Sequence, residues 1–419
     1  MKIETNNLLV PDYMNLDFFK GVLEEGLYII NGKFTRIVFE MGSGAGDNYC
    51  SSIYRVKMVF KRTDDAPEEE LSVIIKCIPI TEATQFLENV GVYVVEKSMY
   101  QDIIPRMEIL LSNSNFGAKM YYAQRQPIYT LAFEDLKVKG FTTAVRQDLL
   151  DEEHSRMIMT KLGQFHATSM VLAQRDPSVL NRYKAGMLSA ANVKGSGTFK
   201  KMFGSQLKYL GTLAQSWPGF EKIGGKLLQY YEEFNDNLVA SAGRRPTDIT
   251  VLNHGDLWVN NFMFKYGQQS QRPLDSLLVD FQLCFYGSPG CDINFFLNSS
   301  VKLEILQKFR ESFVETYYNA FKTTLEDCNY DKIPTLADIK NQVKSRERVG
   351  LFALFAFLPM VMLDKEASEE SSIEGLANEE TALKVFKEMF KNEKLLSLLK
   401  YGLKRFDDMG VIDDGYVEQ

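Results

Sequence analysis

The sequence predicts an α+β fold in which a strand-rich N-terminal part containing one helix precedes a mainly helical remainder. Short apolar segments with alternating polar residues recur between residues 26 and 133, and a single helical pattern interrupts them. From residue 147 onward, helical spacing dominates. With 419 residues, 45% of them hydrophobic, the chain is long enough for one large two-lobed unit or for two to three ordinary domains.

The N-terminal part begins with a strand, a Gly-rich turn and a second strand between residues 26 and 60. Apolar side chains occupy every second position from Tyr54 to Phe60, which is the period of a half-buried strand. The other elements predicted here are an apolar strand over 71–80, a helix over 84–104 that Pro105 ends, and strands over 119–122 and 128–133.

A polar segment containing a glycine, EDLKVKGF, follows the last of these strands and indicates a boundary between two lobes. We place the N-lobe at residues 1–135 and the C-lobe at residues 136–419. The elements predicted in the C-lobe are helices over 147–172, 200–213 and 219–242, a strand-rich island over 250–279, and further helices from residue 292 to the end.

Composition excludes several classes of partner. The formal net charge is −7 and no block of Lys and Arg occurs, so we expect no nucleic-acid partner. The longest apolar run, residues 350–363, is too short to span a bilayer and suits a buried helix, so we expect no membrane anchor. The first residues lack the order of a signal peptide, which favours a cytoplasmic protein. Five cysteines without a C-x-x-C pair indicate reduced thiols.

The most informative segment is VLNHGDLWVNNFMF, residues 251–264, in which Asn261 stands five positions after Asp256. A second segment, LLVDFQ, puts Asp280 at the end of another apolar strand after a turn. Phosphoryl transfer needs a carboxylate that orients the attacking hydroxyl and further oxygen ligands that hold Mg²⁺ on the phosphates. Asp256, Asn261 and Asp280 supply these groups.

Each of these residues alone is more often a turn or cap residue, and only the ordered pair of segments favours chemistry. His254 has two interpretations, a catalytic base or a histidine that braces the loop, and its place before the Gly-Asp turn favours bracing. We interpret Trp258 as local packing.

Lys76 lies in the middle of the apolar segment SVIIKCIPI, where a buried ammonium is costly unless it has a partner. On the following helix, Glu96 shares a face with apolar residues, so a Lys76–Glu96 pair explains both anomalies. Glu88 is the alternative partner. In the opposing interpretation, Lys76 reaches solvent at a sheet edge and Glu96 is merely exposed.

A glycine-rich turn, MGSGAGDNY, lies between the first two predicted strands. It opens no helix and contains no G-K-[ST], so it is neither a dinucleotide-binding nor a Walker A loop. Its glycines allow backbone amides to approach phosphates, although the segment alone is typical of a flexible hairpin. Hydrolase and metalloprotease motifs are absent, and the chain has only three histidines.

Taken together, these residues resemble the ecdysteroid-kinase-like, or CHK-kinase-like, family of insects, which is related to choline kinase and the aminoglycoside phosphotransferases. The resemblance covers most of the chain. It rests on GAGDNYCSSIYRV, VIIKC, EKSMYQDIIP, LAFEDLKVKGF, LGQFHATS, HGDLWVNN and VDFQ followed by GSPGCDI.

The resemblance implies a protein-kinase-like fold with ATP and Mg²⁺ between an N-lobe, made of an antiparallel sheet and one helix, and a mainly helical C-lobe. The resemblance implies that Asp256 is the catalytic carboxylate, that Asn261 and Asp280 are the Mg²⁺ ligands, and that Lys76 with Glu96 binds the α- and β-phosphates. It also implies that Gly44, Gly46 and Asn48 belong to the nucleotide-binding turn and that the backbone of Glu134, Asp135 and Leu136 binds the adenine. Asp292 is implied as the brace of the catalytic loop and His166 as a structural histidine.

The sequence departs from protein kinases in reading HGD for HRD and DFQ for DFG, and it lacks an A-P-E signature, which disfavours protein substrates. The family implies a small hydroxylated acceptor, an ecdysteroid or another steroid or a xenobiotic alcohol. Two alternatives stay open: a catalytically silent nucleotide-binding protein, and a choline- or aminoglycoside-type kinase, whose cationic acceptor needs an acidic or aromatic pocket. Aromatic and aliphatic C-lobe segments lean toward an apolar acceptor.

Overall fold

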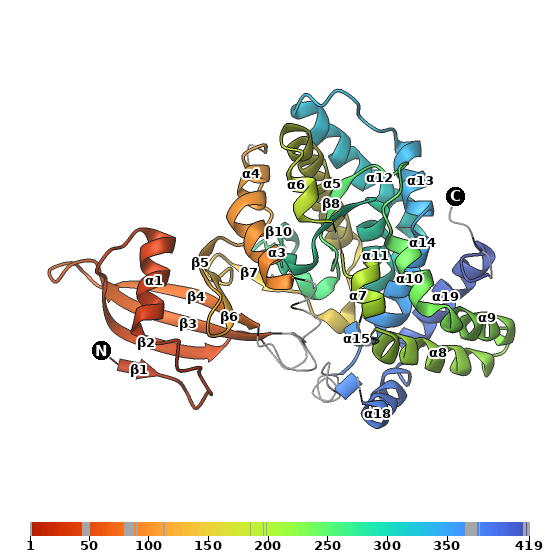
Figure 1. Cartoon of the computed structure of the whole chain (residues 1–419), viewed down its shortest axis with the longest axis horizontal. Coiled ribbons are helices and arrows are strands. Elements are labelled where there is room, and N and C mark those ends of the chain that lie inside the picture. The colour runs from red at the N-terminus through yellow and green to blue at the C-terminus, as the bar shows by residue number, and fades with distance from the viewer. Residues whose placement is uncertain are drawn as a thin grey trace.

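The computed structural model describes residues 2–43, 51–78, 88, 91–111, 114–184, 186–195, 197, 199–364, 375–376, 378–413 and 416. Strands of the first third form a sheet at one end of the molecule, and helices make up the larger part at the other end (Figure 1). The α+β class predicted from the sequence is therefore confirmed.

The N-terminal sheet has six strands in the order β1-β2-β3-β4-β6-β5. The pairs are antiparallel except for β1 and β2, which run parallel. The strands are β1 (Lys2–Glu4), β2 (Lys33–Met41), β3 (Ser52–Lys61), β4 (Glu69–Ile78), β5 (Met120–Gln124) and β6 (Tyr129–Glu134). All strands predicted in this part are present, and the prediction of a purely antiparallel sheet is corrected by β1.

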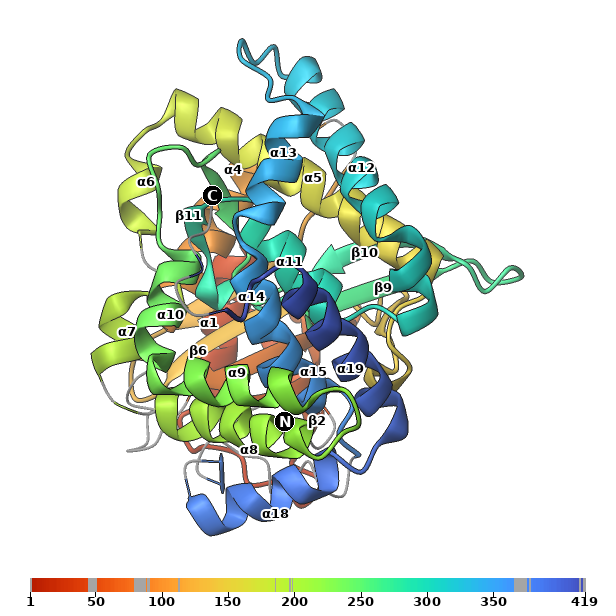
Figure 2. The same ribbon diagram turned by 90° about the vertical axis from the view of Figure 1, so that its right-hand side faces the viewer.

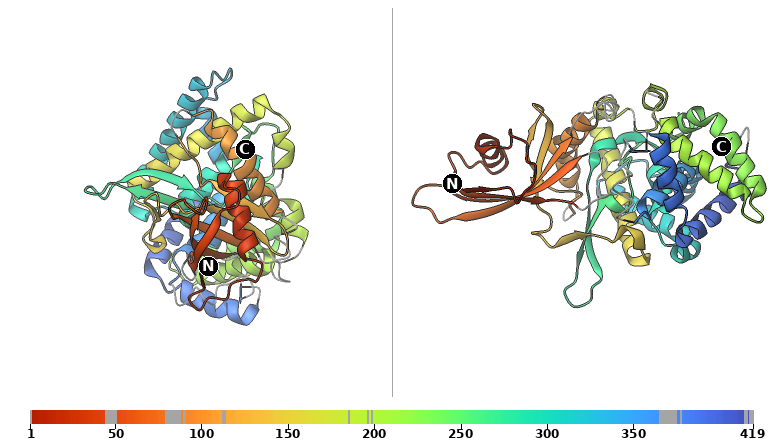
Figure 3. Two further views of the ribbon diagram at one scale, coloured as in Figure 1. Left: turned by 90° about the vertical axis from the view of Figure 1, so that its left-hand side faces the viewer. Right: turned by 90° about the horizontal axis from the view of Figure 1, so that it is seen from below.

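Helix α1 (Leu16–Leu27) lies across this sheet and is a second N-terminal helix that we did not predict (Figure 3). Its first turn is capped by Asn15, whose Oδ1 accepts hydrogen bonds from the amides of Asp17 and Phe18 at 3.0 and 3.3 Å. The helix buries Phe18 and Phe19 in a small core against the strands, so this part of the molecule carries its own apolar centre.

The predicted helix that precedes β5 is present but continues further than expected. It consists of α3 (Val92–Ser98), a π-helical turn η1 (Met99–Ile103) and α4 (Ile104–Glu108). The prediction that Pro105 ends the helix is wrong, because Pro105 stands in the first turn of α4, where its missing amide costs little. The predicted start at residue 84 lies outside the described residues.

The helical part surrounds a long central pair, α5 and α12, which lie side by side (Figure 2). A side chain at Gly163 of α5 would meet the Tyr317 carbonyl oxygen of α12 at 2.5 Å, so glycine permits this close approach. The helical elements are η2 (Arg146–Asp148), α5 (Glu152–Arg175), α6 (Val179–Arg182), α7 (Ala190–Gly195), η3 (Lys200–Gly204), α8 (Ser205–Gln215), α9 (Glu221–Glu232), α10 (Phe234–Ala242), α11 (Gly290–Ser299), α12 (Leu303–Asp327), α13 (Leu336–Lys344), α14 (Glu347–Phe352), η6 (Ala353–Phe357), α15 (Leu358–Val361), α18 (Glu379–Met389) and α19 (Glu393–Asp408).

The apolar run over 350–363 falls in α14, η6 and α15 and is buried, as predicted. Among the described helices, none is both long and apolar enough to cross a bilayer. Cys77, Cys284, Cys291 and Cys328 are free thiols, and Cys50 lies outside the described residues.

Short strands between α10 and α11 bring the two motif segments together. They are β8 (Val251–Asn253), β9 (Phe262–Tyr266), β10 (Pro273–Leu278) and β11 (Phe285–Gly287), and β7 (Phe141–Thr143) pairs with β9. In the predicted β9–β10 hairpin, Leu278 pairs with Phe262, and the Val279 amide donates to the Asn261 carbonyl at 3.0 Å. Asn261 and Asp280 therefore end adjacent strands.

Candidate active site

A buried lysine stands between two carboxylates that come from distant parts of the chain. Lys76 on β4 donates from Nζ to both carboxylate oxygens of Glu96 on α3, at 2.9 and 2.8 Å, and to Oδ1 of Asp280 at 2.5 Å. Lys76 is 5% exposed and Glu96 is 1% exposed. The predicted Lys76–Glu96 pair is confirmed, and the interpretation of Lys76 as a solvent-reaching edge residue is wrong.

Burial and charge oppose one another in this cluster. Burial alone would lower the pKa of Lys76, but the charges of Asp280 and Glu96 outweigh it and hold the pKa above its usual value, so the ammonium stays charged. Burial raises the pKa of Glu96, and the neighbouring Asp280 charge adds to that rise, while Lys76 opposes it. The site thus holds more negative charge than one lysine neutralises.

Asp256 and Asn261 form a compact unit at the turn between β8 and β9. The Asn261 side-chain nitrogen donates to the Asp256 carbonyl at 2.8 Å and to Asp256 Oδ2 at 3.0 Å. Burial, with the charge of Asp280, raises the pKa of Asp256 to about 7, although hydrogen bonding to Asn261 and Trp258 lowers it in part. Asp256 is therefore a carboxylate that gains and loses its proton near neutral pH.

Asp280 has a left-handed backbone, with φ 68°, which is uncommon for a residue with a side chain. The next residue, Phe281, packs between the rings of Tyr100 and His254, at centroid distances of 5.3 and 4.9 Å. This aromatic anchor fixes the turn that follows β10, and the turn directs Asp280 toward Lys76.

A third buried carboxylate, Asp292, braces the loop that contains Asp256. Its oxygens accept from the amides of His254 and Gly255 at 2.6 and 3.0 Å, and His166 Nε2 lies 3.2 Å away. The bracing role implied for Asp292 is confirmed, and His166 is a buried structural histidine that also contacts the Tyr317 hydroxyl at 3.0 Å.

His254 braces the same loop rather than acting on a proton. Its Nε2 lies 3.0 Å from the carbonyl oxygen of Val279, and the ring is fully buried against Phe281. Burial lowers the pKa of His254, so the ring is neutral. The bracing contact predicted for His254 is present.

The predicted adenine segment, Glu134 to Leu136, lies where β6 ends. Here Asp135 accepts hydrogen bonds from Arg55 Nε and Ser72 Oγ, both at 2.7 Å, and from the Lys137 amide at 3.1 Å. These contacts occupy the Asp135 carboxylate, and the Glu134 carboxylate accepts from the Lys119 amide at 2.7 Å and pairs with Lys139, so neither carboxylate is free for a ligand.

A cavity of about 630 Å³ connects these groups. Its lining includes Lys76, Glu96, Asp280, Asn261 and the segment Glu134 to Leu136, and its apolar walls come from Ile53, Ile74, Phe133, Met263 and Val279. Volumes of 300–1,000 Å³ are typical of small-molecule sites. Gly42 lines the cavity as well, whereas Gly44, Gly46 and Asn48 lie outside the described residues.

Two features of the site escaped sequence analysis. The contact between Lys76 and Asp280 joins residues 204 positions apart, and no local pattern indicates it. The ion pair between Arg55 and Asp135 was also not predicted. The alternation of polar and apolar residues along β3 indicates only which face of the strand Arg55 occupies. Among the described residues, no group of three or more His, Cys, Asp or Glu side chains suits a metal ion.

Comparison with known proteins finds one matching family and several solved structures of low sequence identity. Similar solved structures include the ethanolamine kinase of Plasmodium vivax, with 12% identity over 96% of this chain and 92% of that chain and a TM-score of 0.42. A spectinomycin phosphotransferase in complex with ADP and spectinomycin has 11% identity over 93% and 98%, with a TM-score of 0.44. These scores are below 0.5, so they add no argument.

No curated protein matches the sequence significantly. The model of the ecdysteroid kinase-like family, however, matches residues 45–330, which is more than half of the chain. The matched region contains Lys76, Glu96, Asp256, Asn261 and Asp280. The chain therefore belongs to the ecdysteroid kinase-like family.

Proposed function

We propose that the protein is an ATP-dependent kinase that transfers the γ-phosphate to a hydroxyl of a small molecule. The observation that carries this proposal is that Lys76, Glu96, Asp280 and Asn261 line one cavity and that Asn261 hydrogen-bonds to Asp256 beside it, because an ammonium, carboxylates and an amide are the groups that phosphoryl transfer uses. The N-lobe of residues 1–135 supplies the lysine, and the C-lobe of residues 136–419 supplies Asp256.

Lys76 binds the α- and β-phosphates in this proposal, and Glu96 orients it. The Lys76 ammonium contacts both Glu96 and Asp280. Phosphate oxygens are the anions that compete best for a charged ammonium, so the contact with Asp280 is the one that a nucleotide replaces.

Asn261 and Asp280 fit a magnesium ion because both present oxygens, and hard cations prefer oxygen ligands. Mg²⁺ is commonly held by one or two protein groups together with phosphate oxygens, which agrees with a site lacking a cluster of three acidic or histidine ligands among the described residues. When bound, the ion neutralises phosphate charge during transfer. Asn261 also keeps Asp256 in place through its side-chain nitrogen.

Asp256 orients the acceptor hydroxyl and takes its proton. A pKa of about 7 suits this role, because a base works best when its pKa lies near the working pH. The adenine binds to the backbone of Glu134, Asp135 and Leu136 at the end of β6, and the turn with Gly44, Gly46 and Asn48 contacts the phosphates.

The acceptor that we propose is a steroid, such as an ecdysteroid, or a xenobiotic alcohol, in the cytoplasm. The family supports this class. A catalytically silent protein is the alternative, and the presence of every catalytic group argues against it.

The test is incubation of purified protein and Mg·ATP with pooled ecdysteroids, other sterols, plant alcohols, choline and aminoglycosides, followed by mass spectrometry. We expect a phosphate mass gain on a neutral alcohol that disappears with Asp256→Asn. Nucleotide binding is measured in parallel with a fluorescent ADP analogue. Absence of nucleotide binding would sink the proposal, whereas binding without transfer by any pool would favour the silent protein.

A further inference from the structure

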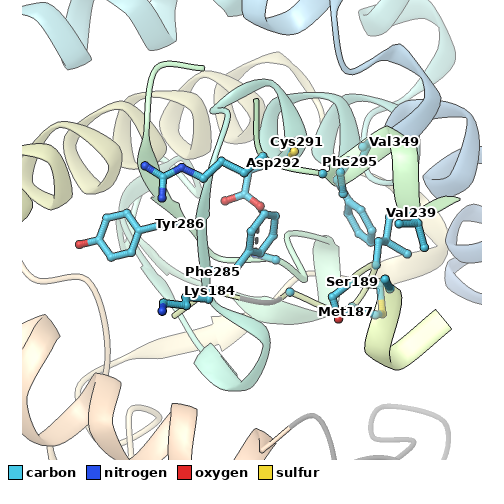
Figure 4. A pocket seen from close by; sticks show the side chains of 17 residues that line it. Lys184, Met187, Ser189, Val239, Phe285, Tyr286, Cys291, Asp292, Phe295 and Val349 are labelled. Atoms are coloured by element: carbon cyan, nitrogen blue, oxygen red, sulfur yellow. Dashed lines mark hydrogen bonds between the residues drawn. The ribbon is translucent and has the colours of Figure 1, made fainter. Parts of the chain in front are cut away.

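A second cavity, of about 200 Å³, lies on another side of the catalytic loop and shares no lining residue with the nucleotide cavity. Its floor is formed by Gly255, Phe285 and Asp292, and its cover is formed by residues 186–190 and the end of α10. Figure 4 shows Lys184 and Tyr286 at one end, and Met187, Val239 and Phe295 at the other. Gly255 directly precedes Asp256, so the cavity touches the catalytic loop itself.

Two glycines allow the chain to pack closely against Phe285 and Leu283 at this cavity. A side chain at Gly186 would meet the Phe285 ring at 2.4 Å, and one at Gly255 would meet the Leu283 carbonyl oxygen at 2.2 Å. Gly255 also has φ 79°, a conformation that favours glycine. The glycine of the HGD sequence is therefore required by the backbone conformation and by the close approach of Leu283.

The cover is held in place from several directions. The Asn192 side chain donates to the Gly186 carbonyl at 2.9 Å, and the Tyr286 amide donates to the Tyr183 carbonyl at 2.8 Å. Lys194 on α7 also pairs with Asp236 on α10, although both side chains are exposed and the pair contributes little. The cavity is therefore a formed site between fixed elements.

The polar groups of the cavity define what it can bind. Ser189 Oγ is buried and forms no hydrogen bond within the described part of the chain, and a buried hydroxyl without a partner is costly. The one lining carboxylate, Asp292, already accepts hydrogen bonds from two loop amides. Lys184 and Arg244 are exposed at the rim, and neither forms an ion pair with a described residue.

The thiol of Cys291 offers no reactive group, because burial raises its pKa to about 12.

The volume of the cavity limits the size of the group that it can bind. An apolar cavity of about 150 Å³ holds one benzene molecule, so this cavity takes a group of about one ring. Four fused steroid rings do not fit, whereas one ring or a branched alkyl end does.

We propose that this cavity anchors a compact apolar end of the acceptor alcohol, and that the acceptor is neutral or anionic but not cationic. The inference rests on the proposed function, since it describes the acceptor of the same reaction. Apolar walls hold the ring, Ser189 binds a polar substituent, and Lys184 with Arg244 favours an anionic one. For a choline- or aminoglycoside-type acceptor, the lining offers no carboxylate free of other hydrogen bonds, and the positive charges of Lys184 and Arg244 oppose a cation despite the aromatic rings of the wall.

The test uses three probes of one shape: benzyl alcohol, 4-(hydroxymethyl)benzoate and 4-(hydroxymethyl)benzylamine. Their binding to the full chain is measured by ligand-observed NMR. We expect the benzoate to bind at least tenfold more tightly than the benzylamine, with benzyl alcohol between them. Equal affinities of the two charged probes would overturn the charge preference.

Matched variants locate the site. Ala190 lines the cavity, and its neighbour Ala191 on the same helix does not, so Ala190→Phe is expected to weaken all three probes at least tenfold while Ala191→Phe leaves them unchanged. Reversal of the rim charge in Lys184→Glu/Arg244→Glu should abolish the preference for the benzoate, whereas Lys201→Glu/Lys222→Glu should keep it. Unchanged binding in Ala190→Phe would overturn the site.

Two readouts separate this inference from the proposed function. With Mn²⁺·ADP bound, the hydroxymethyl protons of the benzoate should relax faster than its ring protons beside the carboxylate, and equal relaxation would remove the acceptor role. Probe binding lost in a chain that still binds fluorescent ADP overturns the cavity assignment alone. Probe binding in a chain that fails to bind ADP overturns the proposed function and the acceptor role with it.

Discussion

The two sides of the catalytic loop each hold a buried carboxylate, and their surroundings differ. On the bracing side, Asp292 accepts hydrogen bonds from two backbone amides and lies beside a histidine, so its carboxylate is held by donors that are fixed in the backbone and the core. On the cleft side, Asp256 has side-chain donors and another carboxylate, Asp280, close enough to raise its pKa. Both carboxylates are buried, and Asp256 is the one whose raised pKa lets it titrate near neutral pH.

This comparison predicts the largest effect on the bracing side. Asp292→Ala should lower the free energy of unfolding by about 3–5 kcal/mol, because buried donors on the loop and His166 lose their acceptor. Urea unfolding measures the loss. Asp236→Ala, which removes an exposed carboxylate paired with Lys194, is the control and should change stability little. Equal losses in both variants would contradict the brace.

On the cleft side, Lys76→Met should lower the free energy of unfolding by about 3 kcal/mol at pH 8 and by less at pH 5. Without the ammonium, the already raised pKa of Glu96 rises further, and an acid with a raised folded pKa loses stability as pH climbs from its unfolded value of about 4.5 toward and beyond 7. Unfolding at both pH values measures this. The control, Lys57→Met on β3, removes a more exposed pair with Glu40 and should show no such dependence.

Asp256→Asn should have the opposite sign. The folded pKa of about 7 exceeds the unfolded value, so folding takes up a proton, and the wild type loses stability as pH rises from about 4 to 7. The variant should gain about 1–3 kcal/mol at pH 8 and nothing at pH 4, while phosphate transfer falls about 10³-fold or more. Thermal unfolding across pH and a transfer assay test the two halves. A variant that is less stable at pH 8 would show that Asp256 is structural.

Asp135 sharpens the contrast within the cleft itself. Burial would raise the pKa of Asp135, but hydrogen bonds from Arg55 and Ser72 outweigh it and lower the pKa. Its contribution is present above the unfolded pKa and is lost as pH falls through the lower folded value, so Asp135→Asn should cost about 1 kcal/mol at pH 8 and less at pH 3 after solvent screening. Thermal unfolding at pH 8 and pH 3 measures the cost. A gain in stability, as expected for Asp256→Asn, would contradict the assignment.

Much of this site could be predicted because its residues violate local rules. Lys76 in an apolar strand and Glu96 on an apolar helix face each indicated that a partner of opposite charge was needed. The five-residue spacing of Asp256 and Asn261 indicated that these two side chains belong to one site. Asp280 meeting Lys76 could not be predicted, since the contact depends on how the sheet rests on the helical part. The prediction that Pro105 ends the helix failed because a π-helical turn precedes it. This turn places Pro105 in the first turn of α4, where a proline is tolerated.

The ion pair between Lys76 and Asp280 also bears on the affinity for a nucleotide. It joins β4 of the sheet to the turn after β10, and it occupies the ammonium that a nucleotide needs. In the proposed function a nucleotide exchanges this ion pair for phosphate contacts, so the measured affinity should be weaker than the phosphate contacts alone would give. The ion pair that positions Asp280 therefore also limits how tightly a nucleotide binds.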